Sequence, residues 1–576
     1  MHSVAALLAG ASILAWSTGG GAVELPRPGE PVDIDQIIAS MSVEEKVGQL
    51  LMVGFGGTRV TPHIRFWVKM RHVGGVALFS RNIVDLEQTA RFTRELMAVD
   101  DQQIPLFVAL DQEGGNVVRV KQGAMVLPGN MALGATRSPT LAYVAGQGLA
   151  IDLRNLGFNM NLAPVLDVNS NPKNPVIGVR SYGERPDLVA ELGAWYVRGQ
   201  QEMGVVAVAK HFPGHGDTQS DSHFSMPSID ADLTRLESIE LRPFKEAMDA
   251  GLDAVMTAHI AVPRIAESPH VPSTLSTTII GEILRKRMGF NGVVITDGLE
   301  MQGIVEQYGS GKAAVLAILA GADMPMILWT PKKKEEVYQA LLAAVVAGEI
   351  TTARLDQSVR RILATKLKRG LFARAVEPLA TVLEGGNRNP LHEQVATRIA
   401  REAVTLVKNN GEVLPLRSVR YRKVAVLAPP GPLANILAAE PNVEVLTVPY
   451  IPSRERRRED VSEAIAMARG ADLLVMAVVN RYHVEMAKAV TKALPYLPVA
   501  VVSLASPYYL ASIPDVDAYV CTYSYLEDAQ IAAAQALLGR SPMVGRLPVT
   551  IPGLAPYGFR VPDPRDASPT VAAAVR

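Results

Sequence analysis

Short apolar runs alternate with amphipathic segments from Ser42 onward, and this alternation limits the possible folds most strongly. The first set of runs occupies residues 74–80, 105–111, 160–168, 205–211, 252–260, 292–298 and 324–329. Nearly continuous apolar strands separated by amphipathic helices are typical of a parallel sheet covered by helices. Seven or eight such units within about 300 residues favour a closed (β/α)8 TIM barrel over an open sheet. Ahead of the first run, Ser42 and Glu45 form a capping-box pattern that predicts the start of a helix.

A second alternating set follows a helical, linker-like stretch. Its five runs occupy residues 423–429, 443–449, 471–480, 498–507 and 516–524 and predict a smaller open sheet. Because 576 residues exceed what one hydrophobic core accommodates, we divide the chain into three parts. These are a TIM-barrel domain at 30–375, a helical connection at 376–415 and a C-terminal α/β sandwich domain at 416–576. The sequence APPGP after the first of these runs lacks the glycine pattern of a dinucleotide site, and no cofactor is expected.

Charge and cysteine content exclude several classes of function. The chain carries 57 basic and 57 acidic residues, so it has no electrostatic reason to bind nucleic acid or an anionic membrane. Its only cysteine, Cys521, excludes internal disulfides and cysteine-based zinc or iron–sulfur sites. We expect a monomer with no nucleic-acid partner and no membrane span.

The first 22 residues, MHSVAALLAGASILAWSTGGGA, are similar to a secretory signal peptide. An apolar run from Val4 to Trp16 precedes small residues, with a cleavage point expected after Ala22, and the run is too short to span a bilayer. No Lys or Arg precedes it, which leaves a misassigned start codon or a buried helix as the alternative. We expect export to the periplasm or the extracellular space, and a cytoplasmic protein if the signal is spurious.

Polar side chains end five of the predicted barrel strands. They are Asp111, Asp167, Lys210 with His211, His259 and Asp297. In a parallel barrel the carboxyl ends of the strands meet on one face, where the following loops build the active site. Each residue alone could be an ordinary polar strand end, but five together predict a functional mouth.

The segment KHFPGHGDTQSDSH at 210–223 concentrates three of the ten histidines of the chain. The spacing of these residues matches no zinc pattern and no phosphate-binding loop, and no metal is expected. A catalytic loop leaving a barrel strand is the remaining interpretation. Asp221 and His223 are two residues apart, so an extended segment places them on one side, where the carboxylate can orient an acid/base imidazole.

Asp297 ends the strand in GVVITDGLEM, 292–301. A carboxylate in a barrel mouth can be a metal ligand, a nucleophile or a general base. Paired with a protonated histidine, a nucleophilic Asp297 would support double displacement at a sugar carbon, with imidazole replacing the usual second carboxylic acid. The residues alone therefore place sugar hydrolysis first among several barrel chemistries.

These segments resemble a known family. KHFPGHGDTQSDSH resembles the signature of glycoside hydrolase family 3 β-N-acetylglucosaminidases of the NagZ type in their two-domain form. Four further blocks resemble that family in order: ALDQEGGNVVR (109–119), NPVIGVRSYGE (174–184), MTAHI (256–260) and ITDGLEM (295–301). The similarity is strong over residues 35–370 and looser in the C-terminal part.

The resemblance implies a role for each matching residue. It implies that Asp297 forms a glycosyl-enzyme, and that His223, oriented by Asp221, protonates the leaving oxygen and then activates water. The positions that match those holding the N-acetylglucosamine hydroxyls are Asp111, Arg119, Arg180, Lys210 and His211. We expect Asp167 and His259 to be supporting or structural residues, because polar groups at strand ends are often satisfied internally, and His215 and Asp217 to shape the loop.

The resemblance implies a retaining exo-β-N-acetylglucosaminidase acting on terminal β-linked GlcNAc, with peptidoglycan-derived GlcNAc–MurNAc fragments or muropeptides as substrates. Alternatives are a GlcNAc phosphorylase, and a family member acting on β-glucosides or chitin oligomers. The Asp-Ser-His motif argues against the β-glucosidase branch, whose acid is usually a distant carboxylate. A non-catalytic cell-wall glycan-binding protein is the alternative of another class, and the intact Asp221, His223 and Asp297 argue against it.

Overall fold

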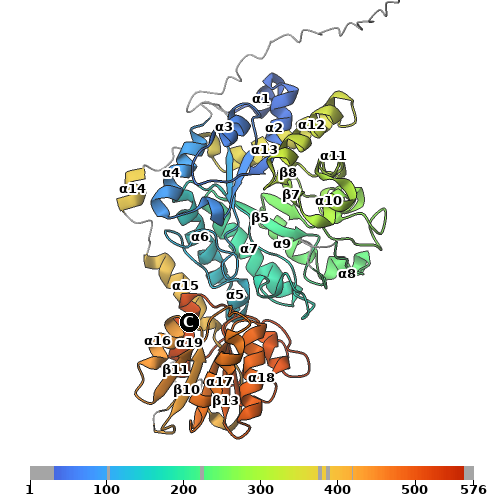
Figure 1. Cartoon of the computed structure of the whole chain (residues 1–576). Helices are drawn as coiled ribbons and strands as arrows, with labels where there is room; N and C mark the ends of the chain where they lie inside the picture. The colour runs from blue at the N-terminus through green and yellow to red at the C-terminus, as the bar shows by residue number, and fades with distance from the viewer. Residues whose placement is uncertain are drawn as a thin grey trace, which may run out of the picture.

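A computed structural model describes residues 32–99, 104–220, 226–373, 379–384, 390–417 and 419–562 (Figure 1). The predicted signal peptide, residues 1–22, lies outside the described residues. Within the described part of the chain, no helix is both long enough and apolar enough to cross a membrane.

The first domain is a closed barrel of eight parallel strands, as the alternation predicts. The strands are β1 (Met52–Gly54), β2 (Gly75–Leu78), β3 (Phe107–Leu110), β4 (Met160–Asn161), β5 (Val206–Phe212), β6 (Ala254–Thr257), β7 (Val293–Gly298) and β8 (Met324–Ile327). Strand β1 closes the barrel by pairing with β8, Met52 opposite Met326. It was not among the seven predicted runs because only two residues, Leu50 and Leu51, separate it from helix-forming sequence.

The capping box at Ser42 is confirmed. The Ser42 hydroxyl accepts a hydrogen bond from the Glu45 backbone, and the Glu45 carboxylate accepts one from the Ser42 backbone. The helix that it starts, α2 (Val43–Gln49), ends three residues before β1.

Helices cover the outside of the barrel. They are α1 (Ile34–Ser40), α3 (Pro62–Lys69), α4 (Leu86–Met97), α5 (Asn130–Thr136), α6 (Pro139–Asn155), α7 (Pro186–Glu202), α8 (Leu233–Ser238), α9 (Arg242–Asp249), the π-type helix η4 (Thr277–Arg287), α10 (Gln302–Tyr308), α11 (Ser310–Ala320), α12 (Pro331–Val346) and α13 (Thr352–Lys368). The close packing of the neighbouring helices α6 and α7 depends on glycine. A Cβ at Gly199 would overlap the carbonyl oxygen of Tyr143, and one at Gly146 would overlap that of Tyr196.

The second domain contains a six-stranded sheet in the order β11-β10-β12-β13-β14-β9. The five predicted runs form its parallel strands β10 (Val424–Ala428), β11 (Val443–Thr447), β12 (Leu473–Val478), β13 (Val499–Ser503) and β14 (Ala518–Cys521). The sixth strand, β9 (Thr405–Asn409), runs antiparallel to β14 and lies inside the segment 376–415 that the sequence analysis treated as a connection. The remaining helices are α14 (Leu379–Glu384), α15 (Pro390–Ala403), α16 (Pro432–Ala438), α17 (Arg456–Ala468), α18 (Arg481–Ala493) and α19 (Glu527–Leu537).

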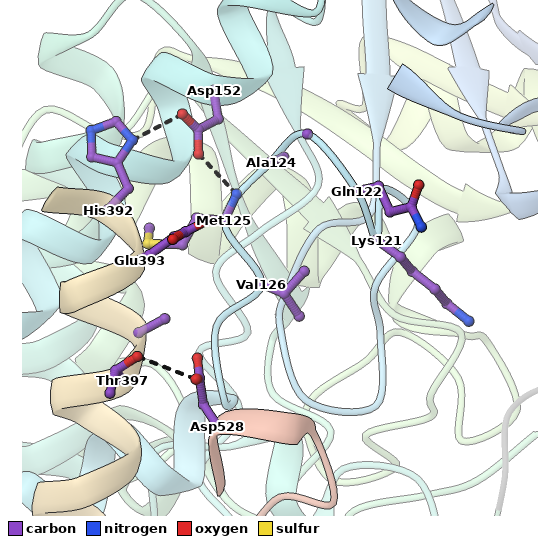
Figure 2. Close-up of a pocket in the computed structure, with 12 residues that line it drawn as sticks. Lys121, Gln122, Ala124, Met125, Val126, Asp152, His392, Glu393, Thr397 and Asp528 are labelled. Carbon is purple, nitrogen blue, oxygen red and sulfur yellow. Dashed lines mark hydrogen bonds and ion pairs between the residues drawn. The ribbon is translucent and has the colours of Figure 1, made fainter. Parts of the chain in front are cut away.

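Helix α15 joins the two domains. It packs against α5 and α6 of the barrel and against α19 of the second domain (Figure 1). The His392 ring on α15 contacts the Asp152 carboxylate on α6 at 2.9 Å, and that carboxylate also accepts a hydrogen bond from the Met125 backbone. A cavity of about 270 Å³ lies beside this contact, between α15, α19 and the loop 121–126 (Figure 2).

A lysine is buried among apolar side chains beside the barrel. Lys366 of α13 has no exposed surface, donates a hydrogen bond to the Gln49 side chain at 2.9 Å and lies 4.9 Å from the centre of the Phe107 ring. No carboxylate pairs with it within the residues that the structure describes. Burial lowers the pKa of this ammonium group from its usual 10.5 to about 7.

We predict that Lys366→Met stabilises the protein at pH 6 by about 1–3 kcal/mol, because it replaces a buried charge with an apolar side chain of similar length. The unfolded chain keeps the Lys366 proton up to about pH 10.5, whereas the folded chain loses it near pH 7. The free-energy cost of burying the Lys366 charge is therefore complete below pH 7 and disappears as the pH rises towards 10.5. Thermal unfolding from pH 6 to 10 measures both effects, with the exposed Lys286→Met as the control. A variant less stable than the parent at pH 6 would contradict this prediction.

Candidate active site

The polar residues that end the barrel strands gather at one mouth of the barrel. Asp111 follows β3, Lys210 and His211 lie in β5, and Asp297 lies in β7. The Lys210 ammonium group contacts the Asp111 carboxylate at 2.7 Å, although the two residues are 99 positions apart in the chain. The end of β7 belongs to the same mouth, because β5, β6 and β7 are neighbouring parallel strands of the barrel.

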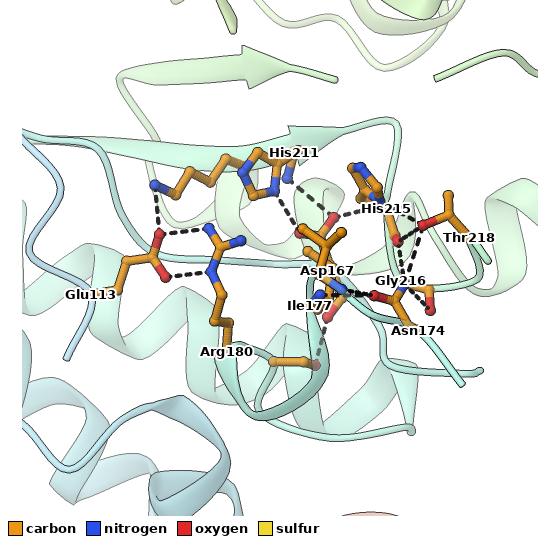
Figure 3. A network of polar contacts seen from close by, with 12 residues as sticks. Glu113, Asp167, Asn174, Ile177, Arg180, His211, His215, Gly216 and Thr218 are labelled. Carbon is orange, nitrogen blue, oxygen red and sulfur yellow. Dashed lines mark hydrogen bonds and ion pairs between the residues drawn. The ribbon is translucent and has the colours of Figure 1, made fainter. Parts of the chain in front are cut away.

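Five charged side chains form a paired cluster on the floor of this mouth. Lys210 also contacts Glu113 at 2.7 Å, and Arg180 binds both oxygens of Glu113 at 2.8 and 2.9 Å (Figure 3). Arg119 contacts Asp111 at 3.2 Å. All four predicted sugar-binding positions in the cluster are therefore brought together, and Glu113 connects two of them.

Burial and charge act in opposite directions on the pKa values of this cluster. Burial alone would raise the pKa of Asp111, but the nearby Lys210 and Arg119 hold it below its usual value. Burial likewise opposes ionisation of Glu113, and Arg180 and Lys210 overcome it, so that its pKa lies far below the usual value. Burial disfavours the Lys210 cation, and its two carboxylate partners raise its pKa. Asp111, Glu113 and Lys210 therefore stay charged at neutral pH.

Sequence reasoning missed Glu113. The side chain is only 3 % exposed and is the sole carboxylate that pairs with both Lys210 and Arg180 among the described residues. It lies two positions after the strand-ending Asp111, outside the predicted apolar run 105–111. The signal that could have identified it is the turn that follows, because Gly114 and Gly115 both have positive φ, at 91° and 55°. Because this turn begins directly after Glu113, it keeps the Glu113 side chain at the mouth of the barrel.

Asp167 organises the loop that leaves β5. Its carboxylate accepts hydrogen bonds from the backbone N–H groups of His211 and His215, at 3.1 and 2.6 Å, and lies 2.7 Å from the His211 ring nitrogen (Figure 3). Asp167 has no exposed surface. The peptide bond between Lys210 and His211 is cis. His211 is thus oriented from behind by a buried carboxylate, and Asp167 acts as a support for the mouth.

The turn 213–218 is fixed from two sides. The Asn174 side chain donates hydrogen bonds to the carbonyl oxygens of His215 and Gly216 at 2.8 and 3.1 Å, and the His215 ring lies 2.7 Å from the Thr218 hydroxyl. Asp217 pairs with Arg235 of α8 at 2.6 Å. Burial lowers the pKa of His215 to about 4, so this ring is neutral at neutral pH. His215 and Asp217 therefore shape the turn that leads to the predicted acid/base pair; Asp221 and His223 lie outside the described residues.

Asp297 is partly exposed, and one of its oxygens accepts a hydrogen bond from the Gly298 backbone at 2.7 Å. Behind it, the buried His259 places its ring nitrogens 2.8 Å from the Thr274 hydroxyl and 3.0 Å from the Gly298 carbonyl oxygen. His259 therefore braces the strand end that carries Asp297. No three His, Cys, Asp or Glu side chains in the described part of the chain are placed to share a metal ion.

Two family matches cover most of the chain. Residues 42–365 match the Glycosyl hydrolase family 3 N terminal domain, and residues 404–567 match the Glycosyl hydrolase family 3 C-terminal domain. The chain belongs to glycosyl hydrolase family 3. It is a glycoside hydrolase, and its barrel and second sheet are the two domains of that family, related to the NagZ-type β-hexosaminidases.

Known proteins similar to this chain include several hexosaminidases. Beta-hexosaminidase A of Pseudoalteromonas piscicida is 37% identical over 385 residues, which span 62% of this chain and 63% of that protein. Beta-N-acetylglucosaminidase/beta-glucosidase of Cellulomonas fimi is 29% identical over 542 residues, 89% of this chain and 94% of that protein. The solved structure of a family 3 β-N-acetylglucosaminidase from Paenibacillus sp. str. FPU-7 superposes with a TM-score of 0.82 at 36% identity, covering 89% of this chain and 99% of that one.

We predict that Glu113→Gln lowers the free energy of unfolding by about 3–5 kcal/mol, because it leaves Arg180 and Lys210 buried with too few counter-charges. It should also lower kcat/KM for a β-N-acetylglucosaminide at least about 100-fold, because the displaced cations no longer align the substrate. Thermal unfolding and steady-state kinetics measure these effects. The control is Glu87→Gln, which removes a solvent-exposed pair with Arg91 on α4 and should cost less than about 1 kcal/mol. Unchanged kcat/KM in Glu113→Gln would show that the floor does not hold the substrate.

Proposed function

We propose that this glycoside hydrolase is a retaining exo-β-N-acetylglucosaminidase that removes terminal β-linked GlcNAc. The observation that carries the proposal is that one barrel mouth holds both a partly exposed carboxylate, Asp297, and a buried set of hydrogen-bond donors around Lys210 and Arg180. The similarity to proteins named hexosaminidase and β-N-acetylglucosaminidase, over most of the chain for some of them, supports the choice of sugar.

The floor of the mouth suits an uncharged sugar. The Lys210 ammonium group has three N–H donors and uses two of them on Asp111 and Glu113, which leaves a third for a substrate hydroxyl. Arg180 binds Glu113 through Nε and Nη2, which leaves the donors of Nη1 for the sugar. Asp111 offers acceptors to hydroxyl protons. Directed donors and acceptors of this kind recognise a neutral sugar by the positions of its hydroxyl groups.

In the proposed mechanism the Asp297 carboxylate attacks the anomeric carbon, and the bond from that carbon to the leaving oxygen breaks. His223, protonated and oriented by Asp221, gives its proton to that oxygen. Neutral His223 then takes a proton from water, and the water oxygen displaces Asp297 from the anomeric carbon. The two displacements restore the original β configuration.

We predict that Asp297→Ala lowers kcat for p-nitrophenyl N-acetyl-β-glucosaminide at least about 1,000-fold, because the covalent step is lost. Azide should restore part of the rate in this variant and yield the α-glycosyl azide, because the small anion can occupy the space of the missing carboxylate. Proton NMR of the wild-type reaction should show β-GlcNAc as the first product. Asp249→Ala, on the outer helix α9, is the control. Full activity of Asp297→Ala would remove the nucleophile assignment, and α-GlcNAc as first product would contradict the retaining mechanism.

Peptidoglycan fragments are the natural substrates in this proposal, and the enzyme meets them outside the cytoplasm after export through residues 1–22. We predict that GlcNAc–MurNAc is hydrolysed with a higher kcat/KM than cellobiose, because cellobiose lacks the 2-acetamido group. Chromatography of the products measures the rate of hydrolysis of each disaccharide. Equal turnover of cellobiose would favour the β-glucoside alternative.

N-terminal sequencing of protein from a periplasmic fraction tests cleavage after Ala22.

A phosphorylase is the second candidate, because the solved structure of the β-glucoside phosphorylase BglX superposes with a TM-score of 0.78 at 26% identity. A neutral imidazole repels phosphate less than a carboxylate does, so His223 as acid/base is compatible with a phosphate acceptor. The reaction with GlcNAc–MurNAc in phosphate buffer distinguishes the two. Free GlcNAc as the main product supports the hydrolase, and GlcNAc-1-phosphate would support the phosphorylase.

A further inference from the structure

Trp329 is a large apolar side chain left exposed beside the catalytic strand. It follows β8, and 44% of its surface is accessible, whereas Trp67 is buried at 2%. Its ring lies against the end of β7, because a Cβ placed on Gly298 would lie 3.3 Å from both Cη2 and Cζ3 of the indole. Gly298 is the residue directly after Asp297. The indole therefore forms the wall of the mouth next to the proposed nucleophile.

The backbone that carries this exposed ring is held firmly. The N–H groups of Leu328, Trp329 and Thr330 all donate to the Glu300 carboxylate at 2.6 Å. On the other side, Arg81 donates to the carbonyl oxygen of Leu328 at 2.9 Å. Exposed aromatic residues at a surface tip usually lack such support. A preorganised exposed ring is typical of a binding surface, because little conformational entropy is lost when a ligand covers it.

Phe79, after β2, continues the aromatic surface. Its ring centre lies 6.3 Å from that of Trp329, with the planes tilted by 41°. The guanidinium groups of Arg81 and Arg119 lie 4.6 and 5.6 Å from the centre of the Phe79 ring, and Arg119 pairs with Asp111 on the floor. The aromatic surface thus runs along the rim from the Asp297 side to the Asp111 side of the mouth.

We propose that Trp329 and Phe79 form the platform that binds the aglycone sugar, the unit that follows the terminal GlcNAc. The inference rests on the proposed exo-glycosidase function. The floor is lined by buried charges that hydrogen-bond hydroxyl groups, and an exo-acting enzyme places the terminal sugar there. The rest of the substrate then lies at the rim, where the C–H face of a second pyranose can cover the exposed Trp329 ring and the partly buried Phe79 ring. Trp329 therefore determines specificity for sugar aglycones and takes no part in the bond-breaking steps.

The test compares substrates that share the glycone and differ in the aglycone. Methyl N-acetyl-β-glucosaminide offers no second ring, whereas N,N′-diacetylchitobiose and GlcNAc–MurNAc do; nitrophenyl glycosides are avoided, because their own ring could stack on Trp329. In Trp329→Ala we expect kcat/KM for the two disaccharides to fall about tenfold or more, mainly through KM, and the value for the methyl glycoside to stay within about twofold. Trp329→Phe should retain most of the disaccharide activity.

The matched control is Trp195→Ala, because Trp195 is 38% exposed but lies on the outer helix α7. An equal loss on all three substrates would overturn the proposal, since Trp329 would then act on the glycone or on the fold. No loss on the disaccharides would overturn it as well.

A binding measurement separates this proposal from the proposed function. In Asp297→Asn, which is expected not to turn over substrate, titration with diacetylchitobiose should quench tryptophan fluorescence, and the quench should disappear in Asp297→Asn/Trp329→Phe. If the wild type hydrolyses none of the three substrates but the quench depends on Trp329, the function assignment fails while the platform stands. Fluorescence quenching that is unchanged when Trp329 is replaced would contradict the proposed platform.

Discussion

The pairing of Glu113 with Lys210 and Arg180 is the interaction on which the mouth of the barrel depends. Three different strand-to-loop connections supply these residues, after β3, within β5 and after β4. Burying any one of the three charges alone would cost several kcal/mol. Each of the three charges stabilises the others in their buried positions. The proposed sugar-binding groups are therefore held in place by electrostatic attraction. The loops beyond them, including the one that carries Asp221 and His223, start from this fixed base.

The second domain contributes to the same mouth by supporting its loops. Tyr508, after β13, lies 2.9 Å from the Asn169 side chain, and Thr550 contacts the Glu184 carboxylate at 2.7 Å through its backbone. Asn169 belongs to the loop after β4, which also contains Asn174, the residue that fixes the turn at His215. The chain of contacts therefore runs from the second domain through the loop after β4 to the turn that precedes the proposed acid/base pair. This arrangement gives the second domain a role in loop geometry without supplying a residue to the floor.

The sequence predicted the barrel and most of its mouth because both follow from strand periodicity. Asp111, Lys210 and Asp297 end apolar runs, and the parallel barrel must bring such ends together. Glu113 was missed because its place depends on the turn after the strand, which periodicity does not describe. Strand β9 was missed for a related reason: its partner β14 lies more than 100 residues away in the chain, and the short run follows α15 with only one residue between them. The apolar run at 324–329 predicted a strand, but nothing in it indicated that its last residue, Trp329, would be exposed.

The charge balance of the mouth explains how so polar a site can serve a neutral substrate. Three cations, Lys210, Arg119 and Arg180, face three carboxylates, Asp111, Glu113 and Asp297. Asp111 and Glu113 are each engaged by two of the cations, so their charge is largely compensated before substrate enters. Asp297 lies in the same mouth, in β7, and is partly exposed. In the proposed mechanism, positive charge develops on the anomeric carbon in the transition state, and the interaction of Asp297 with that carbon strengthens. The floor would then bind the resting sugar through hydrogen bonds, while Asp297 stabilises the transition state.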